Sequence, residues 1–295
     1  PFEIIIQDNS FKKAEMKKID QVVSRYKNIK FSRNVKNLGL VSNVNRVIKK
    51  AKGEYIAIVN NDDRISSRYI EEIQKFIKTY PNFNIYTTNA CAITDNGNVF
   101  GDYRLYSKNT VIKVKKGIAH LWSNYFINLI SISGATIYKR VYIQSNLFQV
   151  KYGNEADLDN VLGFLSSQDI MYLDLPIYFV RMNSFNTSIE VRSTSDRLGA
   201  YVNRCLDIYE KYIPMFKNTP LYMTRPKTVY FLQLLFKYHY SFTKIKSILR
   251  LERWSELIPI LATAPSFPVI QFKQRILFHL HKHLYKKYHP LKYDL

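Results

Sequence analysis

The spacing of apolar positions in the first 90 residues switches repeatedly between two periods. Short runs rich in β-branched residues predict strands, and stretches with apolar residues three or four positions apart predict helices that bury one face. The expected strands are 3–7, 28–32 and 54–59, and the expected helices are 12–26, 41–52 and a segment that ends near Tyr80. Strands that alternate with helices in this way are typical of βαβ units, so the predicted fold class is α/β with a parallel sheet.

The pattern is mixed between residues 83 and 190 and becomes helical and basic from about residue 191. Strands are expected at 84–93, 129–138, 170–173 and 177–181, a hairpin turn at 95–98 and a helix at 155–166. These changes divide the chain into one α/β domain at 1–190, with halves at 1–90 and 91–190, and a helical basic region at 191–295.

The chain carries a strong positive charge, since 44 Lys and Arg against 23 Asp and Glu give a formal net charge of +21 over 295 residues. Such an excess predicts an anionic partner, which can be a nucleic acid, a phospholipid surface or a phosphorylated substrate. An apolar fraction of 46% excludes a disordered chain. No apolar run is long enough to predict a membrane span, and two distant cysteines, Cys91 and Cys205, predict neither a disulfide framework nor a zinc site.

Two carboxylates, Asp62 and Asp63, follow the predicted strand 54–59. Ligands of open α/β sheets bind at the carboxyl ends of the strands. A pair of carboxylates there can hold a divalent cation that neutralises a diphosphate, and Asn60 can add a neutral oxygen. A simple turn that caps the next helix explains the same residues, and both interpretations stay open at this point.

Several short motifs occur together in a recognisable order. They are 3–10 (EIIIQDNS), 37–39 (NLG), Asn45, 53–56 (GEYI) and 60–63 (NNDD), followed by 134–140 (GATIYKR) and 155–165. In this order and spacing the chain, over about residues 2–190, resembles family 2 of the glycosyltransferases. That resemblance implies a GT-A fold, with a Rossmann-like nucleotide-binding sheet and a mixed acceptor-binding half. It also implies a nucleotide-diphospho-sugar donor (a UDP-sugar is favoured) and transfer with inversion at the anomeric carbon.

The resemblance implies donor-binding roles for residues of the first half. Asp8 corresponds to the family's aspartate that hydrogen-bonds the nucleotide base, although it can also cap the next helix. Asn60-Asn61-Asp62 corresponds to the Asp-x-Asp motif, which leaves Asp62 as the ligand of Mg²⁺ or Mn²⁺. Asn60 replaces the first aspartate and so lowers the negative charge of the site. Asn45 matches an asparagine that lies near the nucleotide.

The resemblance also implies a catalytic base at the start of the helix 155–166. An inverting transfer needs a carboxylate that takes the proton of the acceptor hydroxyl on the face opposite the departing diphosphate. The best register places Asp157 on the family's base, with Glu155 as the rival, and Ala156 replaces the glutamate that usually precedes the base. The alternative is that these acids only complement the dipole at a helix N-terminus.

Three further residues have weaker assignments. Arg181 follows an apolar strand, in the region where the family closes a loop over the diphosphate, and is a candidate for phosphate binding. His120 and Trp122 are candidates for the acceptor side, although lone aromatic residues more often belong to a core.

The family also opens with a strand that precedes the one at 3–7 and lies between it and the strand at 54–59. Nothing before Phe2 supplies this strand, and without it backbone groups on both sides of the gap stay unpaired. We therefore expect further N-terminal residues in the natural protein.

The segment 271–289 predicts a basic amphipathic helix, with an apolar stripe beside a cluster of lysines. This pattern suits an anionic membrane surface, and a helix packed on the catalytic domain suits it equally well. No RNA-binding signature or basic recognition helix accompanies the charge, so a nucleic acid is not the expected partner.

The predicted function is therefore transfer of a sugar to a carbohydrate or lipid-linked saccharide acceptor. A composition rich in Lys, Ile, Asn and Tyr is typical of an AT-rich bacterial genome, where such enzymes build surface glycans at the cytoplasmic face of the plasma membrane. A nucleotidyltransferase is disfavoured because the chain lacks its Gly-rich N-terminal loop. The main alternative is a degenerate, non-catalytic GT-A scaffold that binds a membrane or another anionic partner.

Overall fold

The computed structural model describes residues 1–10, 13–102, 110–114, 116, 133–181 and 291–292, with residues 200, 203–205, 207–208, 210–212 and 214–215. The candidates His120 and Trp122 and the predicted helix 271–289 lie outside these residues. The division at residue 191 also lies outside them and stays a prediction.

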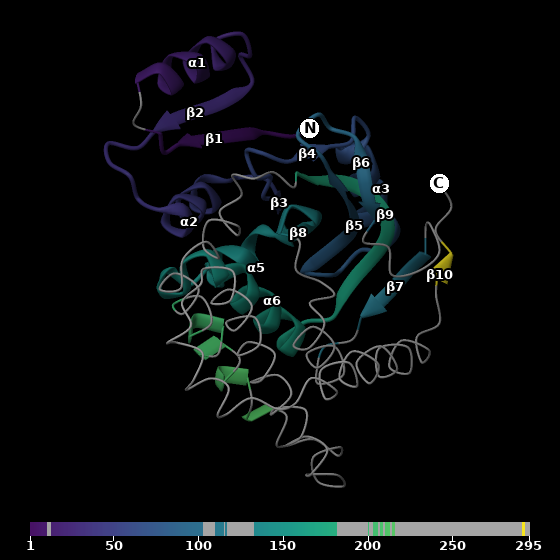
Figure 1. Ribbon diagram of the computed structural model, residues 1–295. Helices are drawn as coiled ribbons and strands as arrows, with labels where there is room; N and C mark the ends of the chain where they lie inside the picture. Colours follow the sequence, from purple (N-terminus) through teal and green to yellow (C-terminus); the bar gives the residue numbers. More distant parts are fainter. Residues whose placement is uncertain are drawn as a thin grey trace, which may run out of the picture.

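The chain opens with the βαβ unit that the sequence predicts. Strand β1 (Ile4–Asp8), helix α1 (Lys13–Val23) and strand β2 (Ile29–Arg33) form a two-stranded parallel sheet with its connecting helix, seen at the top of Figure 1. The register pairs Ile4 with Ile29 and Asp8 with Arg33. The two strands therefore end side by side, and Asp8 lies at the carboxyl edge.

A second sheet forms the body of the protein. Its path runs β10 (Leu291–Lys292), β7 (Thr110–Val114), β9 (Ile170–Arg181), β5 (Ile85–Ile93), β8 (Thr136–Lys139) and β3 (Tyr55–Ala57), while β4 (Arg64–Ile65) pairs with β9 and β6 (Val99–Asp102) pairs with β5. Only β5 and β9 pair in parallel, and the other described pairs are antiparallel. This mixed sheet agrees with the mixed acceptor-binding half that the resemblance implies. The parallel pairing expected for the strands of the first 90 residues does not extend to β3, because β8 lies between β3 and β5 and runs against both.

The two sheets share no strand ladder among the described residues, so β1 and β3 are edge strands. A polar contact joins them at one end, where the Glu3 carboxylate accepts hydrogen bonds from the backbone N–H groups of Lys52 (2.7 Å) and Gly53 (2.8 Å). The resemblance implies a further strand between β1 and β3.

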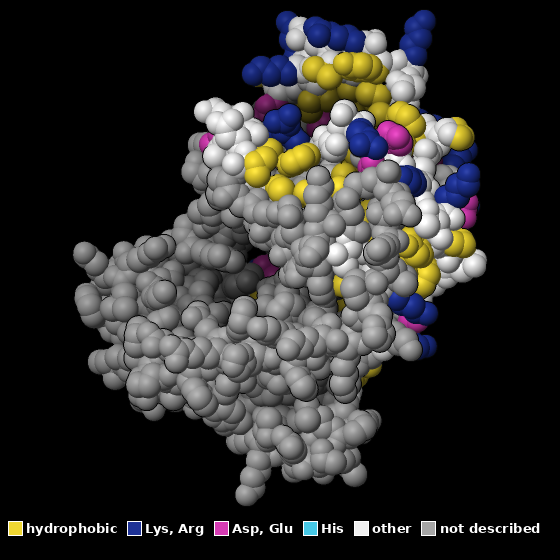
Figure 2. Space-filling model, turned by 90° about the vertical axis from the view of Figure 1, so that its right-hand side faces the viewer, with side chains coloured by type: hydrophobic (Ala, Val, Ile, Leu, Met, Phe, Trp, Pro, Cys, Tyr) yellow, Lys and Arg dark blue, Asp and Glu magenta, His cyan; other side chains and the backbone are white. Residues whose placement is uncertain are grey.

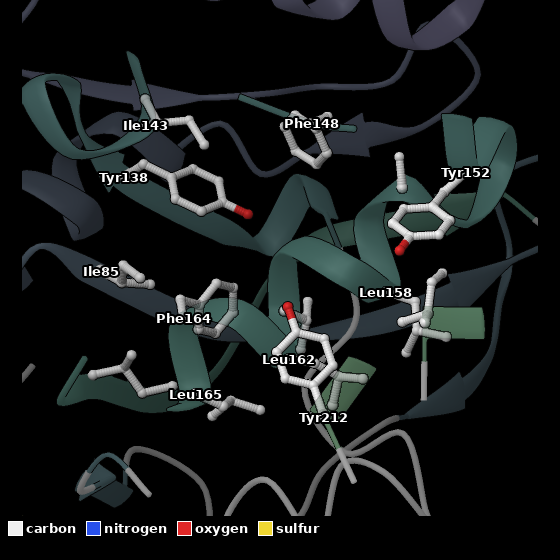
Figure 3. Close-up of a cluster of buried hydrophobic side chains, with 14 of the residues drawn as sticks. Ile85, Tyr138, Ile143, Phe148, Tyr152, Leu158, Leu162, Phe164, Leu165 and Tyr212 are labelled. Atoms are coloured by element: carbon white, nitrogen blue, oxygen red, sulfur yellow. The ribbon is translucent and has the colours of Figure 1, made fainter. Parts of the chain in front are cut away.

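Side chains alternate between the two faces of the larger sheet, and each face has its own core. Tyr86, Ile137 and Met171 belong to a cluster that α3 (Tyr69–Thr79) covers. Their chain neighbours belong to the cluster of Figure 3. The elements that build this second core are α2 (Leu40–Lys50), α5 (Arg140–Ser145), the 3-10 helix η2 (Val150–Glu155), α6 (Ala156–Ser167) and described helical residues between 203 and 212.

Most predicted elements are confirmed with small shifts of their ends, and two regions differ more. The expected strand 129–138 is described only as a 3-10 turn η1 (Ser133–Ala135) followed by β8. The two strands expected at 170–173 and 177–181 are one strand, β9, whose pairing with β5 shifts register where Pro176 interrupts it. None of the described helices has the length and apolar character that crossing a bilayer requires.

Candidate active site

The loop 60–63, which we call the Asp62 loop, follows β3 and is fastened through the carboxylate of Asp63. One oxygen of Asp63 accepts the hydroxyl of Tyr178 at 2.6 Å and the side-chain amide of Asn60 at 3.0 Å. Its other oxygen accepts the backbone N–H of Arg181 at 2.8 Å. Asp63 is therefore used within the protein, as an anchor of the loop on β9.

Asp62 has the opposite environment. Its side chain is exposed and makes no hydrogen bond or ion pair with the described residues, and Asn60 and Asn61 beside it are exposed as well. Of the two adjacent carboxylates, Asp62 is thus the one that can take a ligand from solution. No group of three Asp, Glu, His or Cys side chains that could hold a metal ion occurs in the described part of the chain.

Arg181, at the end of β9, directs its guanidinium toward backbone carbonyls. It donates to the carbonyl of Asp62 at 2.8 Å, to that of Thr94 at 3.0 Å and to that of Asp95. These bonds join the Asp62 loop to the turn between β5 and β6. The expected contact between Arg181 and a phosphate stays a prediction.

Asp8 is buried at the end of β1 and is already engaged. Its carboxylate accepts the backbone N–H of Ser10 at 2.8 Å and forms an ion pair with Arg33 at 2.5 Å. Burial alone would raise the pKa of Asp8, but these two donors together hold it below its ordinary value. Asp8 is therefore a fixed anion, and its contact with a nucleotide base stays a prediction.

A network of side-chain amides supports the loop after Asp8. Asn34, which is buried, receives a hydrogen bond from Gln7 (2.9 Å) and donates to Asn9 (3.0 Å) and to Asn43 on α2 (2.7 Å). Neither this network nor the ion pair of Arg33 with Asp8 was predicted from the sequence. The signal for it was the repetition of Asn after each of the first two strands.

Asn45 connects the two halves of the domain. Its side-chain amide donates to the backbone carbonyl of Phe148 at 2.8 Å, and its side-chain oxygen accepts the N–H of Phe148 at 3.1 Å. The structure therefore shows Asn45 as a link between α2 and the segment that precedes η2. Its expected place near the nucleotide is untested.

Three acids lie at the start of α6, and two of them are paired with cations. Glu155 is buried and forms an ion pair with Arg204, while Asp159 is buried and forms one with Lys211 at 2.7 Å. Asp157, between them, accepts the N–H of Leu158 at 2.7 Å and has no cationic partner among the described residues. Asp157 is thus the unneutralised acid of the three.

The environment of Asp157 favours its protonated form. Burial, with the nearby charge of Glu155, outweighs the Leu158 N–H and raises the pKa of Asp157 to about 6. Asp157 also lies close enough to Tyr138 to raise the pKa of that phenol, after the larger effect of burial. A carboxylate with a pKa near 6 can take a proton and release it again near neutral pH.

The surface of the βαβ unit formed by β1, α1 and β2 is basic. Figure 2 shows Lys and Arg side chains gathered on the upper part of the molecule, over α1 and the strands beneath it. The exposed side chains there include Lys13, Lys17, Lys18, Arg25 and Lys27. A surface of this kind attracts anions.

Residues 1–133 match the model of glycosyl transferase family 2. An uncharacterized glycosyltransferase of Methanocaldococcus jannaschii is 28% identical over 101 residues. That match spans 34% of this chain and 35% of the relative, so the similarity covers about a third of either protein.

Among solved structures, this fold is similar to TarS of S. aureus, residues 1–349, in complex with UDP-GlcNAc. The TM-score is 0.50 and the identity 14%, over 97% of this chain and 82% of that one. This likeness shows the fold, which is the GT-A fold that the motifs imply.

Proposed function

We propose that this chain, a family 2 glycosyltransferase by the match of its first 133 residues, transfers a sugar from a nucleotide-diphospho-sugar to a carbohydrate or lipid-linked saccharide acceptor, with inversion. The observation that carries this proposal is the state of Asp157. It is half-buried and unpaired with a cation, and its pKa is raised to about 6, which are the properties of a positioned general base.

In the proposed reaction the acceptor hydroxyl oxygen attacks the anomeric carbon as Asp157 takes the hydroxyl proton. The bond from the anomeric carbon to the diphosphate oxygen breaks on the opposite face, and the nucleoside diphosphate leaves with the bonding electrons. Glu155 is the rival base. Its carboxylate is already paired with Arg204, and this pairing disfavours Glu155 as a proton acceptor.

At the donor end, Asp62 would hold Mg²⁺ or Mn²⁺ on the diphosphate, with Asn60 and Asn61 beside it. The residues fit such an ion, because a divalent cation of this kind often takes one or two carboxylates from the protein and the rest of its ligands from phosphate and water. When bound, the ion would neutralise the charge of the leaving diphosphate.

Asp8 would accept a hydrogen bond from the base, with its position fixed by Arg33. TarS was crystallised with UDP-GlcNAc, which supports a UDP-sugar as the first donor to test. Asn45 and Arg181 complete the proposed donor site.

The biological setting is part of the proposal. We place the protein in the cytoplasm, at the inner face of a bacterial plasma membrane, in the synthesis of surface glycans. The basic segment 271–289 would attach it to anionic lipids, and no nucleic-acid partner is proposed.

A screen of nucleotide sugars tests this function. The protein is incubated with each donor, with Mn²⁺ or with EDTA, and release of the nucleoside diphosphate is measured with and without saccharide acceptors. Release that depends on Mn²⁺ and rises with an acceptor supports the proposal.

Absence of release with every donor favours the second candidate function, a non-catalytic scaffold. Two departures from the family motifs favour that candidate, namely Asn60 in place of an aspartate and Ala156 in place of a glutamate. Binding of a nucleotide without turnover would be its signature.

A further inference from the structure

The end of β9 lies against the Asp62 loop and bonds to it repeatedly. The Tyr178 hydroxyl donates to Asp63 at 2.6 Å and accepts the backbone N–H of Asn60 at 3.3 Å. Three residues further along, the N–H of Arg181 donates to the second oxygen of Asp63 at 2.8 Å. The first and last residues of the loop are therefore held by the same strand.

The Tyr178 ring is itself held in one position. Tyr178 is fully buried, and its ring packs so tightly on Gly134 that a Cβ at residue 134 would overlap it. Burial, then the hydrogen bond to Asp63, raises the pKa of Tyr178, so the phenol stays a neutral donor at physiological pH. A rigid donor beneath Asp63 limits how far the loop can move.

Arg181 fixes the same loop from its exposed side. Its guanidinium donates to the carbonyl of Asp62 and, beyond the loop, to carbonyls of the turn between β5 and β6. The backbone of Asp62 is thus bonded, while its carboxylate is left without a partner among the described residues. A fixed backbone with a free carboxylate is the arrangement expected of a preorganised ligand.

We propose that Tyr178 and Arg181 are positioning residues of the metal and diphosphate site, and that Asp63 is the anchor through which they act. This inference rests on the proposed function, in which Asp62 binds the ion. It assigns Arg181 to the loop itself, and a direct contact of Arg181 with phosphate is the competing role.

The test compares two variants, each of which removes the hydroxyl of one buried tyrosine. Tyr178→Phe removes the bond to Asp63, whereas Tyr86→Phe, the control, removes an equally buried hydroxyl that donates to the carbonyl of Tyr80, also at 2.6 Å. Calorimetry with UDP, in Mn²⁺ and in EDTA, is the measurement. Tyr178→Phe should weaken binding in Mn²⁺ by about tenfold or more and leave binding in EDTA unchanged, because a hydrogen bond to a charged group is lost.

Two outcomes overturn the inference. If Tyr178→Phe binds UDP in Mn²⁺ as tightly as Tyr86→Phe does, Tyr178 does not position the site. If Arg181→Gln lowers the affinity for UDP in EDTA as much as in Mn²⁺, Arg181 contacts phosphate directly. If Tyr178→Phe does not fold, Arg181→Gln still tests the inference. A loss of UDP affinity that occurs in Mn²⁺ but not in EDTA supports the positioning role.

Asp62→Asn separates this inference from the proposed function. If Asp62→Asn leaves metal-dependent binding of UDP intact, the proposed metal site is wrong. If Asp62→Asn abolishes it while Tyr178→Phe has no effect, the metal site stands and only the positioning role fails.

Discussion

The guanidinium of Arg204 donates a hydrogen bond to the carboxylate of Glu155, two residues before Asp157. This contact pairs the carboxylate of Glu155, the rival base, with a cation. It also joins the helical residues beyond 200 to the start of α6. A second pair, Lys211 with Asp159 at 2.7 Å, does the same on the other side of Asp157. Two cations from one segment thus neutralise the acids that flank the proposed base.

Arg204→Gln is expected to destabilise the protein, because it leaves the buried Glu155 carboxylate without its cation. We expect a loss of about 1–3 kcal/mol in the free energy of unfolding at pH 7, measured by urea denaturation. Lys151→Gln is the control, since Lys151 and Asp207 lie 3.9 Å apart and are both exposed. Equal losses for the two variants would mean that the Arg204 pair is not structural.

Asp62→Asn is expected to remove metal-dependent binding of UDP and to leave the fold unchanged, because the exposed Asp62 carboxylate makes no contact within the described structure. Calorimetry with UDP and Mn²⁺ measures the binding, and a thermal melt measures the stability of the fold. Unchanged affinity in Mn²⁺ would contradict the assignment, and Glu71→Gln, which changes an exposed acid on α3, controls for the loss of one negative charge.

The stability of the protein should depend on the ionisation of Asp157. Its pKa is raised from 3.8 to about 6 in the folded state, so the folded protein binds more protons than the unfolded chain between these values. Stability therefore falls as the pH rises from about 4 to 6. Asp157→Asn should remove this effect and melt above the wild type at pH 8. A wild-type advantage at pH 8 would contradict the raised pKa.

Deletion of residues 271–295 is expected to release the protein from vesicles that contain anionic lipids, because it removes the predicted apolar stripe and its lysines. Turnover on a soluble acceptor analogue should persist. Co-sedimentation at low salt measures the binding, with neutral vesicles as the control. If the full chain does not bind anionic vesicles, the membrane proposal is wrong.

The existence of most elements was predictable, and so was the parallel pairing of β1 with β2, but the direction of β8 was not. Helix α2 was expected at 41–52 and occurs at Leu40–Lys50, since its apolar face has helical spacing. In contrast, the alternation of side chains in β8 is the same whether it runs parallel or antiparallel to β5. Periodicity therefore indicates a strand but not its neighbours. The two strands expected at 170–173 and 177–181 are continuous in β9, with a register shift at Pro176.

The candidate site was predictable as far as its motifs extended. Asp62 and Asp157 are proposed from the motifs of the resemblance, and their roles stay predictions. The ion-pair partner of Glu155 is Arg204, 49 residues away in sequence, and the hydroxyl that holds Asp63 belongs to Tyr178, which is 115 residues away. Contacts at such separations leave no local pattern.

The central claim is that Asp157 is the base, and the turnover of Asp157→Asn against that of Glu155→Gln tests it most directly. Both changes keep the side-chain shape, and both are measured at saturating donor and acceptor, with donor affinity determined in parallel. We predict that Asp157→Asn lowers turnover by roughly 10²–10⁴ with donor affinity little changed, while Glu155→Gln stays within about tenfold of the wild type. The reverse order would make Glu155 the base, and full activity in both variants would contradict the mechanism.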